Sequence, residues 1–272
     1  MRPLEGRSAL ITGGTQGVGG AIAMALAKAG ANVVLHGLVH DDAADDTLAN
    51  CRRANVRAEL VVGDLTRPIP TSIPQLFQRA CELMPAIDLL VNNAGTYIDR
   101  PFLEMDWETY DRTMRLNVDA GYFLTQAFAQ RWINMQVAGR VLFTGSINGF
   151  LAEPDHTAYD ASKGAVASLV RSLCVSLGPH GIRVNSIAPG LVRTPLTNQV
   201  LDKDAESVAW MQLHTPNHQV PGPEVCGGAA VFLLSDAASH IHGQTLLIDG
   251  GMSASQQPNL PPYLRPALRE MI

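Results

Sequence analysis

Seven short apolar runs, each followed by a stretch long enough for a helix, constrain what this chain can fold into. Runs such as Ala-Leu-Ile at 9–11 and Leu-Leu-Val at 89–91 contain no polar residue, which is typical of strands buried on both faces of a parallel sheet. The predicted strands are Ser8–Thr12, Asn32–His36, Ala58–Val62, Asp88–Asn92, Arg140–Thr144, Arg183–Ile187 and Thr245–Ile248. The alternation predicts an α/β fold with a single doubly wound parallel sheet of seven strands flanked by helices.

The segments between the strands complete the expected organisation. The predicted helices are Gly17–Ala29, Asp41–Ala54, Ile73–Leu83, Trp107–Met135, Ala158–Leu177 and Glu224–Leu234. Because no linker divides this pattern, residues 1–252 are expected to form one domain on a sheet of Rossmann type. Residues 191–220 are too long for a plain connection and are a candidate substrate lid. Residues 253–272 form a proline-rich C-terminal tail.

Composition and charge narrow the class of protein. The chain has 272 residues, 46% of them hydrophobic, and a formal net charge of −5, with no basic stripe of the kind that binds nucleic acid. It has no run of 18 uncharged apolar residues, so no membrane span is expected, and its N-terminus lacks the apolar core of a signal peptide. Its four cysteines are far apart, without a CxxC pair. We therefore expect a reducing compartment, the cytoplasm, with neither a disulfide framework nor a metal cluster.

The first strand runs directly into a glycine-rich turn, Gly13-Gly-Thr-Gln-Gly-Val-Gly19, which a helical pattern follows. In that context glycines let backbone N–H groups approach a pyrophosphate, and the helix N-terminus adds partial positive charge. The spacing G-x-x-x-G-x-G differs from the usual G-x-G-x-x-G, and a flexible turn without a ligand is the alternative interpretation. The residues expected to line a dinucleotide here are Gly13, Thr15, Gln16, Gly17, Val18 and Gly19.

The end of the second strand should meet the adenosine ribose, where an acidic residue favours NAD and a basic residue accepts the 2′-phosphate of NADP. This chain has His36-Gly37-Leu38, which offers neither. Asp41 and Asp42 follow shortly and would repel a 2′-phosphate, so NAD is favoured over NADP. Asp64, after the third strand, is expected to accept a hydrogen bond from the adenine amino group, with a turn-capping aspartate as the alternative.

Tyr159 and Lys163 are four residues apart on a predicted helix and therefore share one face. A tyrosine with an ordinary pKa of about 10 is a poor acid–base catalyst at neutral pH, and a neighbouring ammonium group lowers that pKa. Ser146 follows the fifth strand in a Gly-Ser turn, at the carboxyl end of the sheet where open α/β sheets bind ligands. Its hydroxyl is placed to hydrogen-bond a substrate oxygen, while a turn-forming serine is the alternative.

Taken together, these stretches resemble the short-chain dehydrogenase/reductase family. The resemblance covers about residues 5 to 252, with the motifs in the order and spacing of the family. The matching stretches are Thr12–Gly19, Asp64, Asn92-Asn-Ala-Gly95, Asn117, Ser146, Tyr159–Lys163, Pro189-Gly190 with Thr194, and Asp249-Gly-Gly251. The resemblance implies NAD(P)-dependent hydride transfer between nicotinamide and a secondary alcohol or ketone. The substrate would be a small alcohol, polyol, sugar or keto compound.

The same resemblance implies a role for each site residue. Tyr159 would be the general acid in reduction and the general base in oxidation, and Ser146 would orient the substrate oxygen. Lys163 would also hydrogen-bond the nicotinamide ribose, and Asn117 would hold a water that joins Lys163 to solvent. The other residues expected against the cofactor are Asp64, Leu65, Asn93, Ala94, Gly95, Val192 and Thr194. This chemistry needs no metal.

Two further functions stay open on this fold. One is a non-catalytic dinucleotide-sensing or scaffold protein, which would need no proton relay; the presence of Asn117, Ser146, Tyr159 and Lys163 argues against it. The other is an epimerase or dehydratase that retains its cofactor. The resemblance also implies a homo-oligomer, a tetramer or a dimer, in which the two longest helices pack between subunits.

Three histidines and an aspartate near the predicted site allow more than one interpretation. His156 is expected either to touch substrate or to be an exposed loop histidine, and Asp160 is expected to be solvated. His214 and His218 have metal-like spacing, but Pro216 between them disfavours a regular helix, so we predict no metal site. Family members often carry Gly-Arg where this chain has Pro216-Asn-His218, a departure that concerns the substrate side or assembly.

Overall fold

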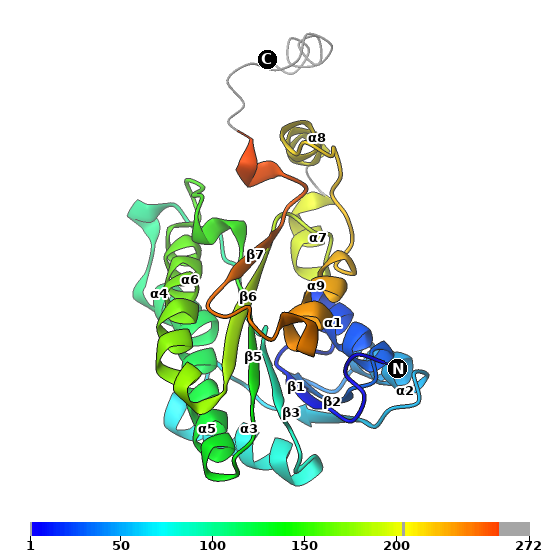
Figure 1. The fold of residues 1–272 in the computed structure, drawn as a ribbon. Coiled ribbons are helices and arrows are strands. Elements are labelled where there is room, and N and C mark those ends of the chain that lie inside the picture. Colours follow the sequence, from blue (N-terminus) through cyan, green and yellow to red (C-terminus); the bar gives the residue numbers. More distant parts are fainter. Residues whose placement is uncertain (1, 203–204, 256–272) are drawn as a thin grey trace.

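The strands form one sheet in which every neighbouring pair runs parallel (Figure 1). The computed structural model describes residues 2–202 and 205–255. The strands are β1 (Ser8–Ile11), β2 (Asn32–Gly37), β3 (Ala58–Val62), β4 (Leu89–Asn92), β5 (Arg140–Thr144), β6 (Arg183–Pro189) and β7 (Thr245–Ile248). Their order is β3-β2-β1-β4-β5-β6-β7, so the sheet grows one way from β1 to β3 and the other way from β4. The predicted doubly wound, seven-stranded sheet is confirmed.

Both faces of the sheet are buried, which explains the unbroken apolar runs in the sequence. In β1, Ala9 and Ile11 belong to one hydrophobic core and Leu10 belongs to the other, and all three are shielded from solvent. The run at 89–91 in β4 divides between the two cores in the same way. Side chains alternate between faces along a strand, so a strand covered on both sides favours apolar residues at every position.

Helices cover the two faces in two layers. They are α1 (Gly17–Lys28), α2 (Asp42–Arg52), α3 (Ile69–Leu83), α4 (Trp107–Met114), α5 (Ala120–Asn134), α6 (Thr157–Leu177), α7 (Pro195–Leu201), α8 (Ala205–His214) and α9 (Val225–Leu234). α1, α2 and α9 pack into one core, through side chains such as Leu26 and Leu233. α3, α5 and α6 pack into the other, through side chains such as Phe128 and Val170. Figure 1 shows α5 and α6 on the opposite side of the sheet from α1 and α9.

The helix predicted over Trp107–Met135 is interrupted at its centre. α4 passes into a π-helical segment, Arg115–Asp119, before α5 begins. Asn117 lies inside this wider turn, where its buried side chain accepts a hydrogen bond from the Thr96 N–H at 2.8 Å and donates to the Thr96 carbonyl at 2.9 Å. The prediction of one continuous helix is wrong here, because single π-helical turns depend on tertiary contacts such as these, which helical periodicity does not reveal.

Several other helix boundaries differ from the sequence prediction by one to four residues, among them the starts of α3 and α2. α3 begins at Ile69 and not at Ile73, with Pro70 in its first turn, where the missing N–H of proline has no helical partner to lose. α2 begins one residue after Asp41, whose carboxylate accepts a hydrogen bond from the Ala44 N–H at 3.0 Å and caps the helix.

The segment predicted as a lid, residues 191–220, contains α7 and α8 on either side of residues 203–204, which lie outside the described part of the chain. Of the predicted tail, 253–272, only residues 253–255 are described, and Met252–Ala254 form a short 3-10 turn. Within the described ranges, no helix is both long and apolar enough to span a membrane.

The contact between α1 and α9 gives a sharp test of the packing. A Cβ on Gly227 of α9 would lie 2.7 Å from the Cβ of Ala25 in α1, whereas a Cβ on the adjacent Gly228 would meet nothing within 4 Å. We expect Gly227→Ala to lower the free energy of unfolding by about 1–3 kcal/mol, because the helices must separate. Gly228→Ala should raise it by about 0.5–1 kcal/mol, since alanine loses less backbone entropy than glycine in a helix. Urea unfolding of both variants measures the difference, and equal effects would contradict this packing.

Candidate active site

The glycine turn after β1 is shaped by its backbone. Gly13 and Gly17 have φ angles of +60° and +56°, which residues with a Cβ rarely adopt, and a Cβ on Gly19 would lie 2.1 Å from the Gly13 carbonyl oxygen. α1 starts at Gly17 with no acidic residue in its first turn and no side-chain hydrogen bond from Gln16, while Val18 packs against the core. The first N–H groups of the helix are therefore available to an anionic group, which fits a dinucleotide pyrophosphate.

Two side chains from outside hold this turn in place. His36, at the end of β2, is buried; its Nδ1 accepts a hydrogen bond from the Gly13 N–H at 3.3 Å, and its Nε2 lies 3.0 Å from the Gly63 carbonyl oxygen. These two bonds require a neutral ring with its hydrogen on Nε2, and burial lowers the pKa of His36 to about 4. The hydroxyl of Thr47, in α2, donates to the Thr15 carbonyl at 2.7 Å.

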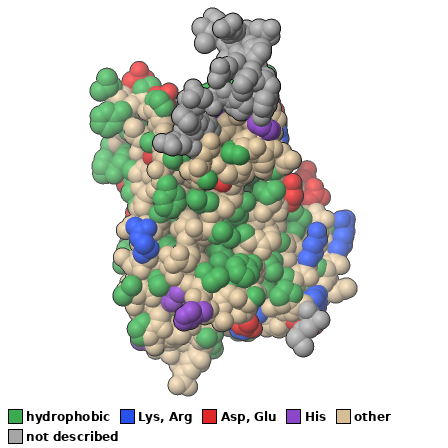
Figure 2. All heavy atoms as spheres, turned by 45° about the horizontal axis from the view of Figure 1, so that its top comes forward, with side chains coloured by type: hydrophobic (Ala, Val, Ile, Leu, Met, Phe, Trp, Pro, Cys, Tyr) green, Lys and Arg blue, Asp and Glu red, His purple; other side chains and the backbone are tan. Residues whose placement is uncertain are grey.

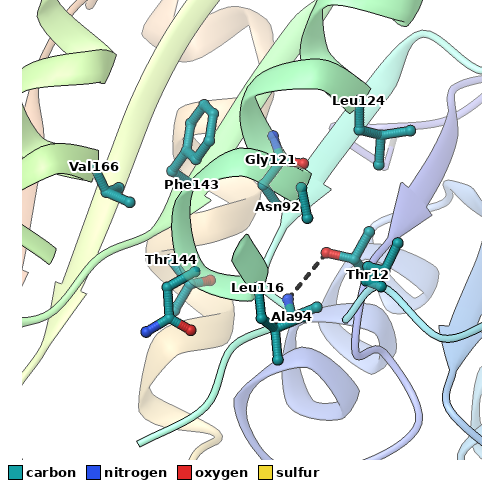
Figure 3. Close-up of a pocket in the computed structure, with 12 residues that line it drawn as sticks. Thr12, Asn92, Ala94, Leu116, Gly121, Leu124, Phe143, Thr144 and Val166 are labelled. Atoms are coloured by element: carbon teal, nitrogen blue, oxygen red, sulfur yellow. Dashed lines mark hydrogen bonds between the residues drawn. The ribbon is translucent and has the colours of Figure 1, made fainter. Parts of the chain in front are cut away.

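The segment Asn93-Ala94-Gly95, after β4, forms the next wall of the crevice. Asn93 Nδ2 donates to two carbonyl oxygens of the glycine turn, at 3.0 and 3.1 Å. The Ala94 N–H donates to the Thr12 hydroxyl at 3.0 Å, the bond drawn in Figure 3. A Cβ on Gly95 would come within 3.1 Å of the Asn117 side-chain oxygen. This segment is thus fixed between the β1 turn and the π-helical segment, and the Asn93 side chain serves that purpose.

A groove of about 630 Å³ opens beside the ends of β2 and β3, with Leu38, Asp64, Leu65 and Arg67 among its lining residues. Its volume is in the range of small-molecule sites, and its place is that expected for the adenosine end of a dinucleotide. Asp64 Oδ1 accepts hydrogen bonds from the hydroxyl and N–H of Thr66, at 2.6 and 2.9 Å, and the hydroxyl contributes most to lowering the pKa of Asp64. Asp64 therefore caps this turn through one oxygen, and its second oxygen lies 3.9 Å from Arg67.

Thr194, after β6, lies close to the glycine turn, and Val192 belongs to the same loop. A Cβ on Gly17 would lie 3.6 Å from the Thr194 Cβ, so the two segments approach closely. The Thr194 hydroxyl accepts a hydrogen bond from the Thr197 N–H at 3.2 Å, and the Thr197 hydroxyl donates to the Val192 carbonyl at 2.7 Å. These bonds fix the start of α7 across the crevice from the first turn of α1.

Tyr159 and Ser146 meet at the carboxyl end of the sheet. Tyr159 lies in the first turn of α6, and Ser146 precedes the 3-10 turn Ile147–Gly149, where its hydroxyl accepts a hydrogen bond from the Asn148 N–H at 3.1 Å. Burial raises the pKa of Tyr159 to about 12, although a hydrogen bond with Ser146 favours the phenolate. The structure thus brings the serine hydroxyl and the phenol together.

Lys163 is buried one turn further along α6. Its Nζ donates to the Thr144 carbonyl at 3.0 Å and lies 5.5 Å from the centre of the Tyr159 ring. Burial lowers the pKa of Lys163 to about 8. The sequence predicted that this ammonium would hold the pKa of Tyr159 below its ordinary value, and for the protein's own groups that prediction is wrong, because burial disfavours the phenolate and the charges of Asp160 and Glu153 oppose it.

The Asn117 side chain connects the β4 loop to the catalytic helix. Besides its bonds to Thr96, it donates to the Ser162 hydroxyl at 3.0 Å, and that hydroxyl donates to the Tyr159 carbonyl at 2.6 Å. Both Nδ2 hydrogens and the side-chain oxygen are therefore engaged by protein groups. The resemblance implied that Asn117 holds a relay water. The structure shows that its side chain also holds α6, through Ser162.

A small cavity lies behind this part of the site, between β4, β5 and the π-helical segment (Figure 3). Its volume is about 10 Å³, close to the smallest that holds one water molecule, and its lining includes Asn92, Asn117 and Thr144. The side-chain oxygen of Asn92 is buried and has no hydrogen-bond partner within the described residues. The cavity thus offers one water a polar contact next to the carbonyl that binds Lys163.

Sequence reasoning missed a polar cluster beside Tyr159. His156 is 11% exposed at its side chain, with Nε2 2.7 Å from Asp99 Oδ1, so it is not an exposed loop histidine. Asp160 accepts hydrogen bonds from Asn148 Nδ2 at 2.8 Å and from the Glu153 N–H at 3.0 Å, so the prediction that it is solvated is wrong. The sequence signal for this cluster was the group of acidic residues between positions 153 and 160. Helical periodicity alone predicts that such residues face solvent.

Comparison with known proteins decides the family. Residues 13–253 match a family model described as enoyl-(acyl carrier protein) reductase. The chain is also 34% identical to an L-rhamnose 1-dehydrogenase (NAD(P)(+)) of Sphingomonas sp., over 94% of this chain and all of that protein. The chain belongs to the short-chain dehydrogenase/reductase family.

Other members of the short-chain dehydrogenase/reductase family are similar over the same length. A gluconate 5-dehydrogenase of Gluconobacter oxydans is 34% identical over 93% of this chain and 96% of its own. The crystal structure of a gluconate 5-dehydrogenase from Burkholderia cenocepacia J2315, in complex with NADP and tartrate, superposes with a TM-score of 0.85 at 32% identity, covering 93% of this chain and 97% of that one.

These comparisons confirm the predicted family and the predicted class of enzyme, an NAD(P)-dependent short-chain dehydrogenase/reductase. They give no support to a non-catalytic sensor or to an epimerase or dehydratase. The predicted preference for NAD is not confirmed, since the name of the Sphingomonas enzyme includes both cofactors and the Burkholderia structure contains NADP.

The buried His36 of this short-chain dehydrogenase/reductase makes its stability depend on pH. The pKa of His36 is about 4 in the fold and about 6.5 in the unfolded chain, so below pH 6.5 the unfolded chain binds a proton first. The stabilisation is complete above pH 6.5 and should be lost as the pH falls to 4, by about 3 kcal/mol in all. His36→Gln removes this contribution, so the loss of unfolding free energy between pH 7 and 4.5 should be smaller in the variant than in the wild type.

Urea unfolding at the two pH values measures that difference. His40→Gln, at an exposed histidine nearby, is the matched control and should lose as much stability as the wild type. Parallel losses in the wild type and in His36→Gln would contradict the role given to the His36 ring.

Proposed function

We propose that this protein is an NAD(P)-dependent oxidoreductase that interconverts a secondary alcohol and a carbonyl group on a sugar or polyol. The observation that carries the proposal is the position of the Tyr159 phenol, which is bonded to Ser146, stands beside Lys163, and lies at the carboxyl end of the same sheet as the glycine turn. The sugar and sugar-acid dehydrogenases among the relatives support the substrate class.

A nicotinamide cofactor bound along this edge of the sheet would supply the hydride chemistry. Tyr159 donates its phenolic proton to the carbonyl oxygen in reduction and takes the hydroxyl proton in oxidation. Ser146 hydrogen-bonds the same substrate oxygen and holds it against the phenol. A phenol whose pKa is about 12 keeps its proton at neutral pH, which suits reduction directly.

Oxidation needs the phenolate, and Lys163 is the group that would stabilise it. With a pKa lowered to about 8, its amine is still mostly protonated at neutral pH, and the cation stands close enough to the ring to favour the ionised phenol. A water in the small cavity lined by Thr144 and Asn117 would be the expected relay water that joins Lys163 to solvent.

The glycine turn, with Thr15, Gln16 and Val18 in it, is proposed to hold the pyrophosphate, and the groove beside Leu65 is proposed to hold the adenosine. Val192 and Thr194 would bind the carboxamide, and residues 191–220 would close over the substrate as a lid. The preference for NAD stays our prediction. Asp41 near the ribose end is engaged as a helix cap, and Leu38 is apolar and 62% exposed, so neither would bind a 2′-phosphate.

Exposed hydrophobic side chains and free cysteines support proposals about assembly and location. Phe102, Leu103 and Trp107 are more than 70% exposed, and hydrophobic side chains gather over the face shown in Figure 2, which supports a homo-oligomer, either a tetramer or a dimer. All four cysteines are free, which supports a reducing compartment such as the cytoplasm.

The catalytic proposal is tested by Tyr159→Phe. We expect turnover of an alcohol panel with NAD⁺ or NADP⁺ to fall by about 10²–10⁴-fold, because the proton donor and acceptor is gone. NADH affinity, measured by protein fluorescence, should change little. Tyr110→Phe, on a partly exposed face of α4, is the control and should keep full activity. Wild-type turnover by the Tyr159→Phe variant would contradict the proposal.

The cofactor preference is tested by the shift of the melting temperature with NADH or NADPH, since the tighter ligand stabilises the fold more at equal concentration. We expect the larger shift with NADH. Leu38→Arg should reverse the order by placing a cation where the 2′-phosphate would lie, and Leu38→Gln, which adds polarity without charge, should not. A larger shift with NADPH in the wild type would overturn the preference.

A further inference from the structure

Three carboxylates gather beside Tyr159, from two separate parts of the chain. Asp99 comes from the loop after β4, Glu153 precedes α6, and Asp160 lies in its first turn. Asp99 and Glu153 are 42% and 43% exposed at their side chains, so both present oxygens to the solvent side of the site. We call these three residues the acidic rim.

The acidic rim is held in place by three neutral or basic side chains. His156 lies between Asp99, at 2.7 Å, and Glu153, at the longer distance of 3.4 Å. The Tyr97 hydroxyl donates to the other oxygen of Asp99 at 2.8 Å. Asn148 Nδ2 donates to Glu153 at 3.2 Å and to Asp160 at 2.8 Å. The carboxylates are thus fixed in position, which lowers the entropy lost when they bind a ligand.

The acidic rim is next to the reacting oxygen. The Tyr97 and His156 rings lie edge-on to the Tyr159 ring, with centres 5.5 and 6.3 Å away. Asn148, which holds two of the carboxylates, also bonds to Ser146 through its N–H. Burial makes the largest contribution to the raised pKa of Tyr159, and the negative charges of Asp160 and Glu153 raise it further. A substrate whose oxygen contacts Tyr159 and Ser146 therefore lies within the field of the acidic rim.

The acidic rim and His156 together carry a negative charge whether the His156 ring is protonated or neutral. Burial lowers the pKa of His156, but Glu153 and Asp99 raise it above its ordinary value overall. Three carboxylates leave a net charge of −2 with the ring protonated and −3 with it neutral. Arg100 and Arg193, on loops at this end of the sheet, are already paired with Asp106 and Asp202.

We propose that this site takes a neutral polyhydroxylated substrate, an aldose or a polyol, and that the acidic rim excludes sugar acids. Asp99 and Glu153 accept hydrogen bonds from substrate hydroxyls, because a carboxylate oxygen has spare lone pairs and charge-assisted bonds are stronger than neutral ones. A substrate carboxylate would lie against like charge. The nearby cations are already engaged, Arg100 and Arg193 by carboxylates and Lys163 by the Thr144 carbonyl. The inference rests on the proposed function and names its substrate class.

The reaction balances for such a substrate. The carbon that carries the oxidised hydroxyl loses a hydride to the oxidised nicotinamide, and the hydroxyl proton passes to the Tyr159 oxygen. The C–O single bond becomes a C=O double bond, and the other hydroxyls of the sugar are unchanged. Those hydroxyls are the groups that the acidic rim binds.

The first test compares each sugar with its acid, L-rhamnose with L-rhamnonate and D-glucose with D-gluconate, and includes the polyols L-rhamnitol and D-glucitol, which like the acids lack the anomeric hydroxyl but carry no charge. We expect kcat/KM with NAD(P)⁺ to be at least about tenfold higher for the better aldose than for its acid. Because repulsion between charges is screened by salt, the ratio should shrink at high ionic strength. A higher kcat/KM for the acids, or turnover of neither class, would overturn the inference.

The second test uses the isosteric variants Asp99→Asn and Glu153→Gln. Each should raise KM for the aldose by about 10–100-fold, since a charge-assisted hydrogen bond becomes a neutral one, and should raise kcat/KM for the acid. Glu82→Gln, on the exposed surface of α3, is the control and should change neither. Unchanged values for both substrates in both variants would contradict the role of the acidic rim.

Binding without turnover separates this inference from the proposed function. Calorimetric titration of the Tyr159→Phe variant, loaded with NAD⁺, should show binding of the aldose and none of the matched acid at equal concentration. If the wild type oxidises alcohols that lack further hydroxyls and the titration shows no aldose binding, the proposed function stands and the inference falls. If no alcohol of any class is oxidised, the proposed function itself falls. The wild-type kcat/KM values and their salt dependence keep the test decisive even if a variant does not fold.

Discussion

Burial of a phenol and an ammonium group in one pocket is the constraint on which the site depends. Burial raises the pKa of Tyr159 to about 12, with a further contribution from the charges of Asp160 and Glu153, and burial lowers that of Lys163 to about 8, which moves both groups toward their neutral forms. Each charged form is therefore costly when it is formed alone in this site. A pair poised in this way can pass a proton to and from a substrate without leaving either partner as an isolated buried ion.

Placing that pair requires several loops to be fixed at one edge of the sheet. All seven strands are parallel, so their carboxyl ends and the loops that follow share this edge. Side chains then tie neighbouring loops together: His36 joins the β1 turn to β3, Asn93 joins that turn to β5, and Asn117 joins the β4 loop to α6. These buried polar side chains make the hydrogen bonds to loop backbone groups that water would otherwise make. They therefore fix the loops that position Tyr159 and Lys163.

The sequence predicted what depends on local pattern and missed what depends on register. The seven strands follow from apolar runs at positions such as 9–11, and Tyr159, Lys163 and Ser146 were found because helical spacing and strand ends place them together. The task of His36 could not be found, since its partners Gly13 and Gly63 are 23 and 27 residues away and meet it only once the strands pair in register. The π-helical segment at Asn117 and the capture of Asp160 by Asn148 have the same cause, because each depends on a contact between separate elements.

The acidic rim links the acid strength of the phenol to what the site binds. Glu153 and Asp160 raise the pKa of Tyr159 because their charges oppose a phenolate, and this opposition is strongest while their oxygens have few donors. A ligand hydroxyl that donates to Glu153 disperses part of that negative charge and so favours ionisation of the phenol. A ligand carboxylate would add to the charge and keep the phenol protonated. Recognition and proton transfer would then depend on the same carboxylates, so that a neutral, hydroxyl-rich ligand both fits the site and makes Tyr159 a better base for oxidation.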